Sequence, residues 1–401
     1  MDVRVTAILI LEAAAALGLL YASGLLRRPW QVVVSALLIA AAFGARWLCL
    51  NHETLDYVNF LAVWVQRFRD GGGFAALGES FGNYNLPYLY FLAAFSYSSI
   101  NDLYLIKLLS ILFDIVLAFG AMKLVSLFSR DSGRQLIAFF AVLLWPTVIL
   151  NGAYWGQCDS IYAAFAVLGV WLGLDRRPAA AMICMALSFA FKLQAVFILP
   201  FMVVLLIAGR VKLRHFLLFP LTYIAAILPA VLLGRPLLDT LTLYFDQLGS
   251  AGSGLNYNSP SVFGFIRGSV ENASLLSTAG LIAAFALMLA VFLLVASRKG
   301  AASSQALLGA ALLLCIGIPY LLPHMHDRYF FIADVLTICF AAVNPWYAAL
   351  PLLVGFASFN SYYAYLKGAF LLYTDAGAAA MLLALLIVFF FTARQLYGAE
   401  E

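Results

Sequence analysis

The segment from Asn51 to Tyr57 places polar and ionisable side chains directly after a long apolar stretch. Asp56 has the clearest potential for chemistry in it, because ionisable groups at the mouth of a hydrophobic span must be solvated, paired or used. A carboxylate there can act as a general base that takes the proton from an attacking hydroxyl. By position alone, a helix N-cap or a solvated loop acid is the simpler role. Glu53, three residues earlier, is the alternative base.

Five other polar segments carry groups that could complete a site. They are Tyr154 to Ser160, Lys192 to Gln194, Tyr244 to Gln247, Leu255 to Pro260 and His324 to Arg328. Each has a structural explanation when taken singly: Trp155 could belong to an aromatic belt, and Asp159 could cap a helix. Asn256 and Asn258 could form turns. Lys192 is harder to explain, since a lysine between two apolar runs reaches water only near an interface.

Neither the cysteines nor the histidines have the spacing of a metal site or a disulfide framework. The five cysteines show no CxxC or Cys/His pattern. His324 and His326 are two residues apart, and no third ligand has a recognisable spacing. The chain also lacks the Asp-x-Asp signature of nucleotide-sugar enzymes and a glycine-rich P-loop. We therefore expect a site that works without a metal or a cofactor.

The composition is that of a membrane protein. Hydrophobic residues make up 65% of the 401 residues and charged residues only 10%, whereas soluble proteins have about half and about a quarter. No stretch is polar enough for a separate soluble domain, so we expect one membrane domain over residues 1–401, embedded in a lipid bilayer. Its aqueous parts are two outer loops at about 51–102 and 234–273. The net charge of +4 is small and dispersed, which argues against nucleic acid as a partner.

Apolar segments of bilayer length predict an all-α bundle of about thirteen transmembrane helices, with short amphipathic helices in the outer loops. They lie near residues 5–25, 30–50, 103–128, 135–151, 158–174, 178–191, 194–209, 215–233, 274–297, 304–322, 329–343, 346–366 and 370–392. Residues 178–209 are divided at Lys192, because one long helix would place this lysine in mid-bilayer. Residues 86–100 contain Pro87 and are interpreted as a re-entrant or interfacial piece. Asp114 lies inside a span, where a function and a helix-packing hydrogen bond explain it equally well.

The short basic loops give an orientation for these spans. If thirteen spans alternate, the pairs at 27–28, 176–177 and 298–299 fall on one side, which the positive-inside rule makes cytoplasmic. The N-terminus is then outside and the C-terminus inside. Asp56 and all five other polar segments face outward in this arrangement. Sharing one side of the bilayer is the minimum requirement for a common site.

Three of these motifs resemble those of a known family. The segment from Tyr154 to Ser160 reads Tyr-Trp-Gly-Gln-x-Asp-Ser, residues 191–194 read Phe-Lys-x-Gln, and a late His-x-Arg-Tyr element follows at 326–329. Together with the acidic outer loop, they look like membrane glycosyltransferases of the GT-C superfamily, in particular bacterial proteins similar to the mannosyltransferases of glycosylphosphatidylinositol assembly. The similarity covers residues from about 50 to 330. Residues 83–90 resemble the family's Asp-Tyr-Pro-Pro-Leu-Tyr pattern but depart from it at Asn85 and Leu86, which leaves the substrate open.

The resemblance implies transfer of a hexosyl group, such as mannosyl, from a polyprenyl-phosphate sugar donor to a glycan or glycolipid acceptor. Transfer would invert the anomeric carbon and take place at the outer face of a bacterial cytoplasmic membrane. By position, Asp56 matches the family's first-loop catalytic acid and would be the general base. Lys192, His326 and Arg328 are the cations expected to face the leaving phosphate. The residues expected to contact the substrates are Glu53, Tyr57, Tyr154, Trp155, Gln157, Asp159, Gln194, Gln247, Asn256, Asn258 and His324.

Two other classes of protein share parts of this pattern. A secondary transporter should show inverted repeats with broken helices at matching positions, and no such repeat is visible in the sequence. A lipid-linked polysaccharide polymerase or ligase would share the outer-face chemistry. It should also carry an arginine-rich outer loop, whereas the second outer loop contains only Arg235 and Arg267. The transferase is therefore the function that the sequence favours.

Overall fold

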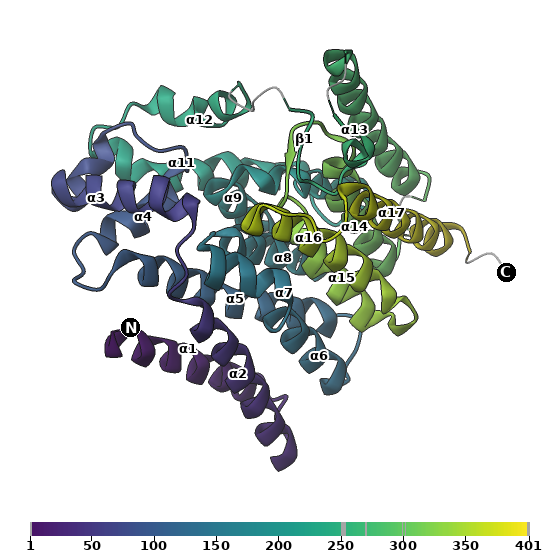
Figure 1. Cartoon of the computed structure of the whole chain (residues 1–401). Coiled ribbons are helices and arrows are strands. Elements are labelled where there is room, and N and C mark those ends of the chain that lie inside the picture. The colour runs from purple at the N-terminus through teal and green to yellow at the C-terminus, as the bar shows by residue number, and fades with distance from the viewer. Residues whose placement is uncertain (1, 250–253, 269–270, 299, 301, 399–401) are drawn as a thin grey trace.

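The computed structural model describes residues 2–249, 254–268, 271–298, 300 and 302–398, without the side chains of residues 246–249. This part of the chain is almost entirely helical (Figure 1). Its only strands are the two-residue pieces β1 (Asn256–Tyr257) and β2 (Met325–His326), which pair in parallel with Tyr257 opposite His326.

Seven of the described helical segments are long and apolar enough to cross a membrane. They are α1 (Val3–Ala22), α2 (Pro29–Cys49), α5 (Asp102–Ser126), Leu213–Leu232, which contains α11 (Leu218–Leu232), α13 (Ala273–Ala296), α14 (Ser304–Leu321) and α17 (Thr374–Tyr397). An eighth crossing is possible if α6 (Ser132–Leu143) is counted with Pro146–Trp155, since the two are bent by 44°.

The other predicted spans also form helices, but thirteen crossings are not confirmed. Their helices are α8 (Asp159–Leu174), α9 (Pro178–Phe191), α10 (Pro200–Ile207), α15 (Phe331–Val343) and α16 (Ala349–Lys367). Apart from α16, these are short apolar helices rather than segments of bilayer length. An apolar run in the sequence shows only that a helix is buried. Helices buried inside the protein and helices in contact with lipid have the same apolar sequence, so the runs do not give the number of crossings.

The centre of the molecule is formed by α5, α8 and α9, and α8 packs closely against both α5 and α9. Small residues make this approach possible: a Cβ atom on Gly169 of α8 would lie 2.9 Å from the terminal carbon of Met185 on α9. Glycines at helix contacts of this kind are typical of membrane bundles. Asn101 fixes the start of α5 by accepting a hydrogen bond from the backbone N–H of Leu103 (2.8 Å).

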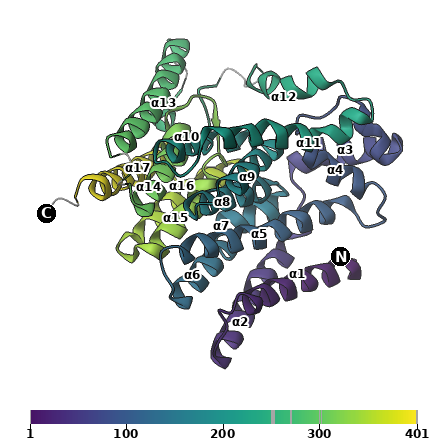
Figure 2. The ribbon, with the colours of Figure 1, turned by 180° about the vertical axis from the view of Figure 1, so that it is seen from behind.

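The peripheral helices α1, α2 and α13 lie at the edges of the bundle, with α1 and α2 side by side (Figures 1 and 2). They leave large apolar side chains uncovered, as at Leu11 on α1 and Phe285 on α13, which are 68% and 62% exposed. Such surfaces are unfavourable in water and favourable against lipid tails. The chain is therefore an integral, multi-pass membrane protein.

The long segment between α2 and α5 is folded rather than extended. It contains a π-helical turn at Tyr57–Leu61, α3 (Ala62–Asp70), a 3₁₀ turn at Gly73–Gly78 and α4 (Leu86–Phe95). The helix α4 is the piece interpreted from sequence as re-entrant or interfacial; it has ten residues and buries most of one side. The second long loop carries α12 (Leu237–Gly249), which lies beside α11 (Figures 1 and 2).

The predicted break at Lys192 is confirmed. The helix α9 ends at Phe191, Lys192 is extended with φ −154° and ψ 136°, and a 3₁₀ turn at Leu193–Phe197 leads into α10. Because the helix is broken here, the side chain of Lys192 points into the protein and is buried there. A break of this kind is what gives Lys192 its place in the site described below.

Candidate functional site

The segment that carries Asp56 is fixed by two buried side chains. Lys107 of α5 donates hydrogen bonds to the carbonyl oxygens of Cys49 (2.9 Å), Leu50 (3.1 Å) and His52 (2.6 Å), where α2 ends. These carbonyls lie at the C-terminal end of the helix, where a cation is favourable. Thr54 donates to the carbonyl oxygen of Trp155 (2.9 Å). The long loop after α2 is thereby tied to both α5 and the Trp155 segment.

The carboxylate of Asp56 accepts three hydrogen bonds from side chains. Trp155 Nε1 (2.8 Å) and Gln157 Nε2 (2.7 Å) donate to Oδ2, and the hydroxyl of Tyr365 at the end of α16 donates to Oδ1 (2.7 Å). No helix-capping hydrogen bond from the backbone reaches this side chain. The N-cap role that position alone suggested for Asp56 is therefore not the one that the structure shows.

Gln157 connects Asp56 to a second group of polar residues. Its amide oxygen accepts hydrogen bonds from the hydroxyl of Tyr84 (3.0 Å) and from Lys192 Nζ (3.4 Å). Its backbone carbonyl accepts from Ser110 (2.7 Å). The chain reaches this position through Gly156, whose φ of 82° ends the π-helical turn at Leu150–Trp155 in a conformation that favours glycine. One amide side chain thus contacts both the carboxylate and the lysine.

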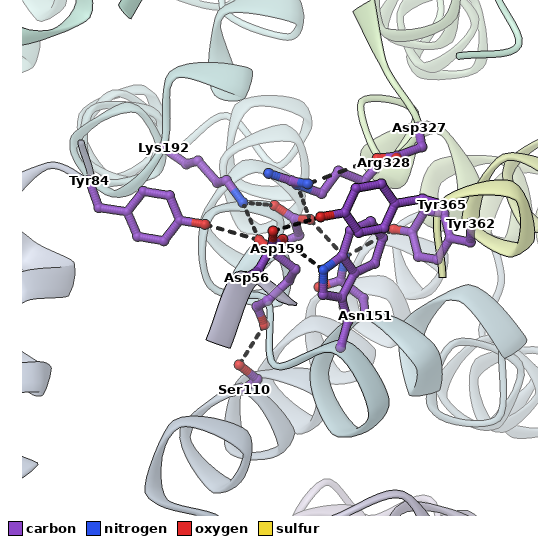
Figure 3. A network of polar contacts seen from close by, with 12 residues as sticks. Asp56, Tyr84, Ser110, Asn151, Asp159, Lys192, Asp327, Arg328, Tyr362 and Tyr365 are labelled. Atoms are coloured by element: carbon purple, nitrogen blue, oxygen red, sulfur yellow. Dashed lines mark hydrogen bonds and ion pairs between the residues drawn. The ribbon is translucent and has the colours of Figure 1, made fainter. Parts of the chain in front are cut away.

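Asp159, at the start of α8, forms the buried centre of the second group (Figure 3). Its carboxylate pairs with the ammonium of Lys192 and accepts a hydrogen bond from Asn151 Nδ2 (2.7 Å). Arg328 Nε lies 3.7 Å from Asp159 Oδ2. The carboxylate therefore holds two cations from distant parts of the chain and does not cap its own helix.

Arg328 is held by charge more than by hydrogen bonds. Its guanidinium lies 5.3 Å from the ring centre of Trp155, a cation–π contact, and Nη1 is 3.9 Å from Asp327 Oδ1. Arg328 Nε and Asp327 Oδ1 are both buried and have no hydrogen-bond partner within the described residues. Burial raises the pKa of Asp327 to about 7, although Arg328 beside it acts in the opposite direction. A largely buried guanidinium with an unused donor is a ready anion-binding group.

A cavity of about 550 Å³ lies next to these cations. Lys192, Arg328, Gln194, His324 and His326 supply its polar wall. Gln194 Oε1 is buried there without a hydrogen-bond partner within the described residues. The apolar part of the wall is formed by Phe191, Leu193, Val196, Phe197, Leu281 and Leu322, among others. The wall of the cavity therefore contains both cationic and apolar side chains.

The two histidines are placed by the β1–β2 pair. The ring of His326 stacks on Tyr257, with centroids 4.7 Å apart, and its pKa is lowered to about 4 by burial and by Arg328. His326 is consequently neutral near pH 7 and offers hydrogen bonds but no charge. His324 Nδ1 is 2.7 Å from the carbonyl oxygen of Gly254. Within the described residues, no group of three His, Cys, Asp or Glu side chains is arranged to hold a metal ion.

The remaining residues expected at the site lie in different surroundings. Asn256 closes a turn with Ser259 through hydrogen bonds of 2.9 and 3.0 Å, and Asn258 has a left-handed φ of 58°. Both therefore play the turn-forming role that was the structural alternative for them. Tyr57 turns away from the site, and its hydroxyl is 3.1 Å from Asp102 Oδ2. The side chain of Gln247, in α12, lies outside the described part of the chain.

Two further expected residues, Tyr154 and Glu53, lie on the segments that carry Trp155 and Asp56. The ring of Tyr154 stacks on His52 with centroids 3.8 Å apart, and its hydroxyl accepts a hydrogen bond from Lys367 Nζ (2.8 Å). Glu53 is exposed and forms no hydrogen bond or ion pair within the described residues. Glu53 therefore lacks the donors that orient Asp56.

Sequence reasoning missed several members of the network: Tyr84, Lys107, Asn151, Tyr362 and Tyr365. A signal existed for α16, because Tyr362, Tyr365 and Lys367 fall at the outer end of the predicted span 346–366. Lys107 and Asn151 lie within apolar runs and had no local signal.

Fold and site together define a class: an integral, multi-pass helical membrane protein with a buried network of charges beside a partly apolar cavity. No family model and no curated protein matches the chain.

Proposed function

We propose that the chain is an inverting membrane glycosyltransferase of the GT-C type. It transfers a hexosyl group, such as mannosyl, from a polyprenyl-phosphate sugar to a glycan or glycolipid acceptor. The observation that carries the proposal is that Gln157 contacts Asp56 through its nitrogen and Lys192 through its oxygen. Gln157 thereby holds the base Asp56 and the phosphate-binding cation Lys192 close to each other. A displacement at the anomeric carbon requires both groups, one for the attacking hydroxyl and one for the leaving phosphate.

Asp56 is the general base in this proposal. The acceptor hydroxyl donates its proton to the carboxylate while its oxygen forms the new bond to the anomeric carbon of the sugar. The bond from that carbon to the phosphate oxygen breaks, and the electron pair leaves with the polyprenyl phosphate. Trp155 and Gln157 hold Asp56 Oδ2, which leaves the carboxylate oriented and Oδ1 nearer to the exposed side.

Lys192 and Arg328 stabilise the leaving phosphate. When Asp327 is protonated, these two cations face the single carboxylate of Asp159, and an incoming phosphate restores the balance of charge. Preorganised cations in a site with little water act strongly on charge that develops in the transition state. His326 is neutral near pH 7, so it contributes a hydrogen bond at most.

The shape of the cavity fits a lipid-linked donor. Its wall contains the cations Lys192 and Arg328 and also the apolar side chains of Phe191, Phe197 and Leu281. A polyprenyl phosphate has the same division, with a charged head and a hydrocarbon chain. The proposal needs no metal, because protein cations take the role that a divalent ion has with nucleotide-sugar donors.

The motif Tyr154 to Asp159 has a positioning role in this proposal. Trp155 and Asp159 are fully buried, so they cannot stack on a sugar or bond its hydroxyls as the family resemblance implies. They hold Asp56, Lys192 and Arg328 instead. Tyr154 is half-buried and can still contact a sugar.

The direct test is sugar transfer by the purified protein in liposomes, with a panel of radiolabelled polyprenyl-phosphate sugars. Transfer of one sugar with inversion supports the proposal. If no donor in the panel reacts and an assay for solute uptake is positive, the protein is a transporter. Transfer of a preassembled oligosaccharide from a polyprenyl diphosphate would instead identify a polysaccharide ligase or polymerase.

The outward-facing orientation in the cytoplasmic membrane has its own test. With the native cysteines blocked, a cysteine at Ala75 should react with an impermeant reagent in intact cells, and one at Arg176 should not. Ala75 is suitable because its side chain is exposed and already carries a Cβ atom. The reverse pattern of labelling would place the site on the cytoplasmic side.

A further inference from the structure

Asp56 separates two unlike surroundings. On one side it reaches Lys192 and the cavity through Gln157, which is 2% exposed, and Trp155, which is fully buried. On the other side its only side-chain donor within the described residues is Tyr365, which is 38% exposed. The donors to Asp56 Oδ2 are thus parts of the core, whereas the donor to Oδ1 lies at the surface.

Tyr365 is also the donor that can leave Asp56 without disturbing the core. One face of its ring stacks on Trp155, with centroids 4.5 Å apart and planes 19° apart (Figure 3 shows Tyr365 beside Asp56). Removing its hydroxyl from Asp56 needs only a small movement of an exposed side chain. Displacing Trp155 or Gln157 would leave buried polar groups unpaired, which is costly.

The surface around Tyr365 has the chemistry of a sugar site. A second aromatic pair, His52 stacked on Tyr154, is carried by the segments that hold Asp56 and Trp155. Lys367, two residues after Tyr365, donates to the Tyr154 hydroxyl. Flat aromatic rings offer apolar contact, while the carboxylate, hydroxyls and ammonium offer hydrogen bonds. A sugar ring, with an apolar face and a rim of hydroxyls, matches this combination better than a hydrocarbon chain does.

We infer that this surface is the acceptor subsite, that it takes a sugar ring, and that the Tyr365 hydroxyl occupies the place of the acceptor hydroxyl until the acceptor binds. The inference rests on the proposed function and adds to it the place where the acceptor sugar binds and the role of Tyr365. On binding, the acceptor hydroxyl replaces Tyr365 as the donor to Asp56 Oδ1, and the Tyr365 ring remains as a contact for the sugar face. The proton that Asp56 then takes comes from the acceptor and not from Tyr365.

The test compares Tyr365→Phe, which keeps the ring, with Tyr365→Ala, which removes it. Full-length protein in nanodiscs is titrated with methyl glycosides of mannose, glucose and galactose without donor, and binding is followed by saturation-transfer NMR. Tyr365→Phe should bind a glycoside at least as tightly as the wild type, because the hydroxyl no longer competes for Asp56. Tyr365→Ala should bind about tenfold more weakly, the size of a lost ring-stacking contact. Tyr363, which packs near Phe359 on the same helix, supplies matched Phe and Ala controls that should not change binding.

Three results would overturn the subsite: no glycoside binding by the wild type, weaker binding by Tyr365→Phe, or unchanged binding by Tyr365→Ala in a folded protein. Binding of a peptide rich in serine and threonine in place of every glycoside would overturn the sugar as acceptor. The subsite and the proposed function can fail separately. Glycoside binding with no transfer from any polyprenyl-phosphate sugar would refute the function alone, and transfer with an unchanged acceptor KM in Tyr365→Ala would refute the subsite alone.

Discussion

Two buried ion pairs in the described part of the chain are built differently. In the first, Arg46 of α2 bonds Asp114 of α5 at 2.8 and 2.9 Å, and both side chains are fully buried. Arg46 also donates to the carbonyl oxygens of Ala42 (3.0 Å) and Leu143 (2.8 Å), and Ser160 donates to Asp114. This pair joins helices, and its charged groups are well supplied with partners.

The second pair is Lys192 with Asp159, and it has Arg328 as an additional cation. Here Arg328 approaches Asp159 only to 3.7 Å, and its Nε has no hydrogen-bond partner within the described residues. Both cations border the cavity. Buried charges are normally paired and hydrogen-bonded, so incomplete pairing beside a cavity indicates a place for a ligand. The comparison separates a structural ion pair from one that we assign to function.

The largest effect should come from breaking the structural pair. Arg46→Met leaves Asp114 buried without its countercharge, and a loss of this kind costs about 3–5 kcal/mol of stability. The double variant with Asp114→Leu should recover most of that loss, because an apolar pair removes the uncompensated charge. Unfolding in mixed micelles measures both. If Arg46→Met were as stable as the wild type, the pair of Arg46 with Asp114 would not be a structural ion pair.

The next effect concerns catalysis without loss of the fold. Asp56→Asn keeps the size of the side chain but cannot accept a proton, so turnover should fall on the order of a hundredfold. The unfolding midpoint should change little, unlike that of Arg46→Met. Glu53→Gln is the matched control and should be mild, since Glu53 has no orienting donors. Normal turnover by Asp56→Asn would show that Asp56 is not the general base. An inactive Glu53→Gln would show that Glu53 is the base instead.

A smaller effect is expected on donor binding. Arg328→Ala should weaken binding of a polyprenyl-phosphate sugar about tenfold, and Arg328→Lys should weaken it less, because lysine keeps the charge and loses the planar fork. Equilibrium binding to the Asp56→Asn background measures affinity without turnover. The control is Arg67, which forms an exposed ion pair with Glu79 in the long loop between α2 and α5. Equal losses with alanine and lysine would make the fork unimportant, and no loss would assign Arg328 to structure.

The smallest effect is a pH dependence at Asp327. Burial raises its pKa from 3.8 to about 7, so the folded protein binds this proton more tightly than the unfolded chain does. The stability of the folded protein therefore falls as the pH rises from about 4 to about 7. Above that range the ionised carboxylate also competes with the donor phosphate for Arg328, and Asp56 and Asp159 are the other charges that act on it.

Asp327→Asn should remove this dependence. The variant and the wild type should bind the donor alike below pH 6, and the variant should bind a few-fold more tightly above pH 8. Donor titrations across this range provide the measurement. A wild-type affinity that is constant from pH 6 to 8 would contradict the assignment.

The elements that carry the site were largely predictable from the sequence. The ends of the apolar runs at 50, 174 and 191 coincide with helix ends within a residue, because a polar residue or a Gly/Pro break stops a hydrophobic helix wherever it is. The division at Lys192 follows from the same rule. The number of crossings was not predictable, since a run such as α15 is apolar through burial by its neighbours.

The sequence by itself determined that this is a helical membrane protein, and it marked Asp56, Gln157, Asp159, Lys192 and Arg328 as polar groups that need an explanation. It did so because a charge in an apolar setting is locally conspicuous. Only the tertiary structure decided which of these groups meet. Gln157 between Asp56 and Lys192, Tyr365 over Asp56, and Arg46 on Asp114 are contacts between segments far apart in the chain. Such contacts are set by how the helices pack, and helix packing leaves no pattern in any single stretch of sequence.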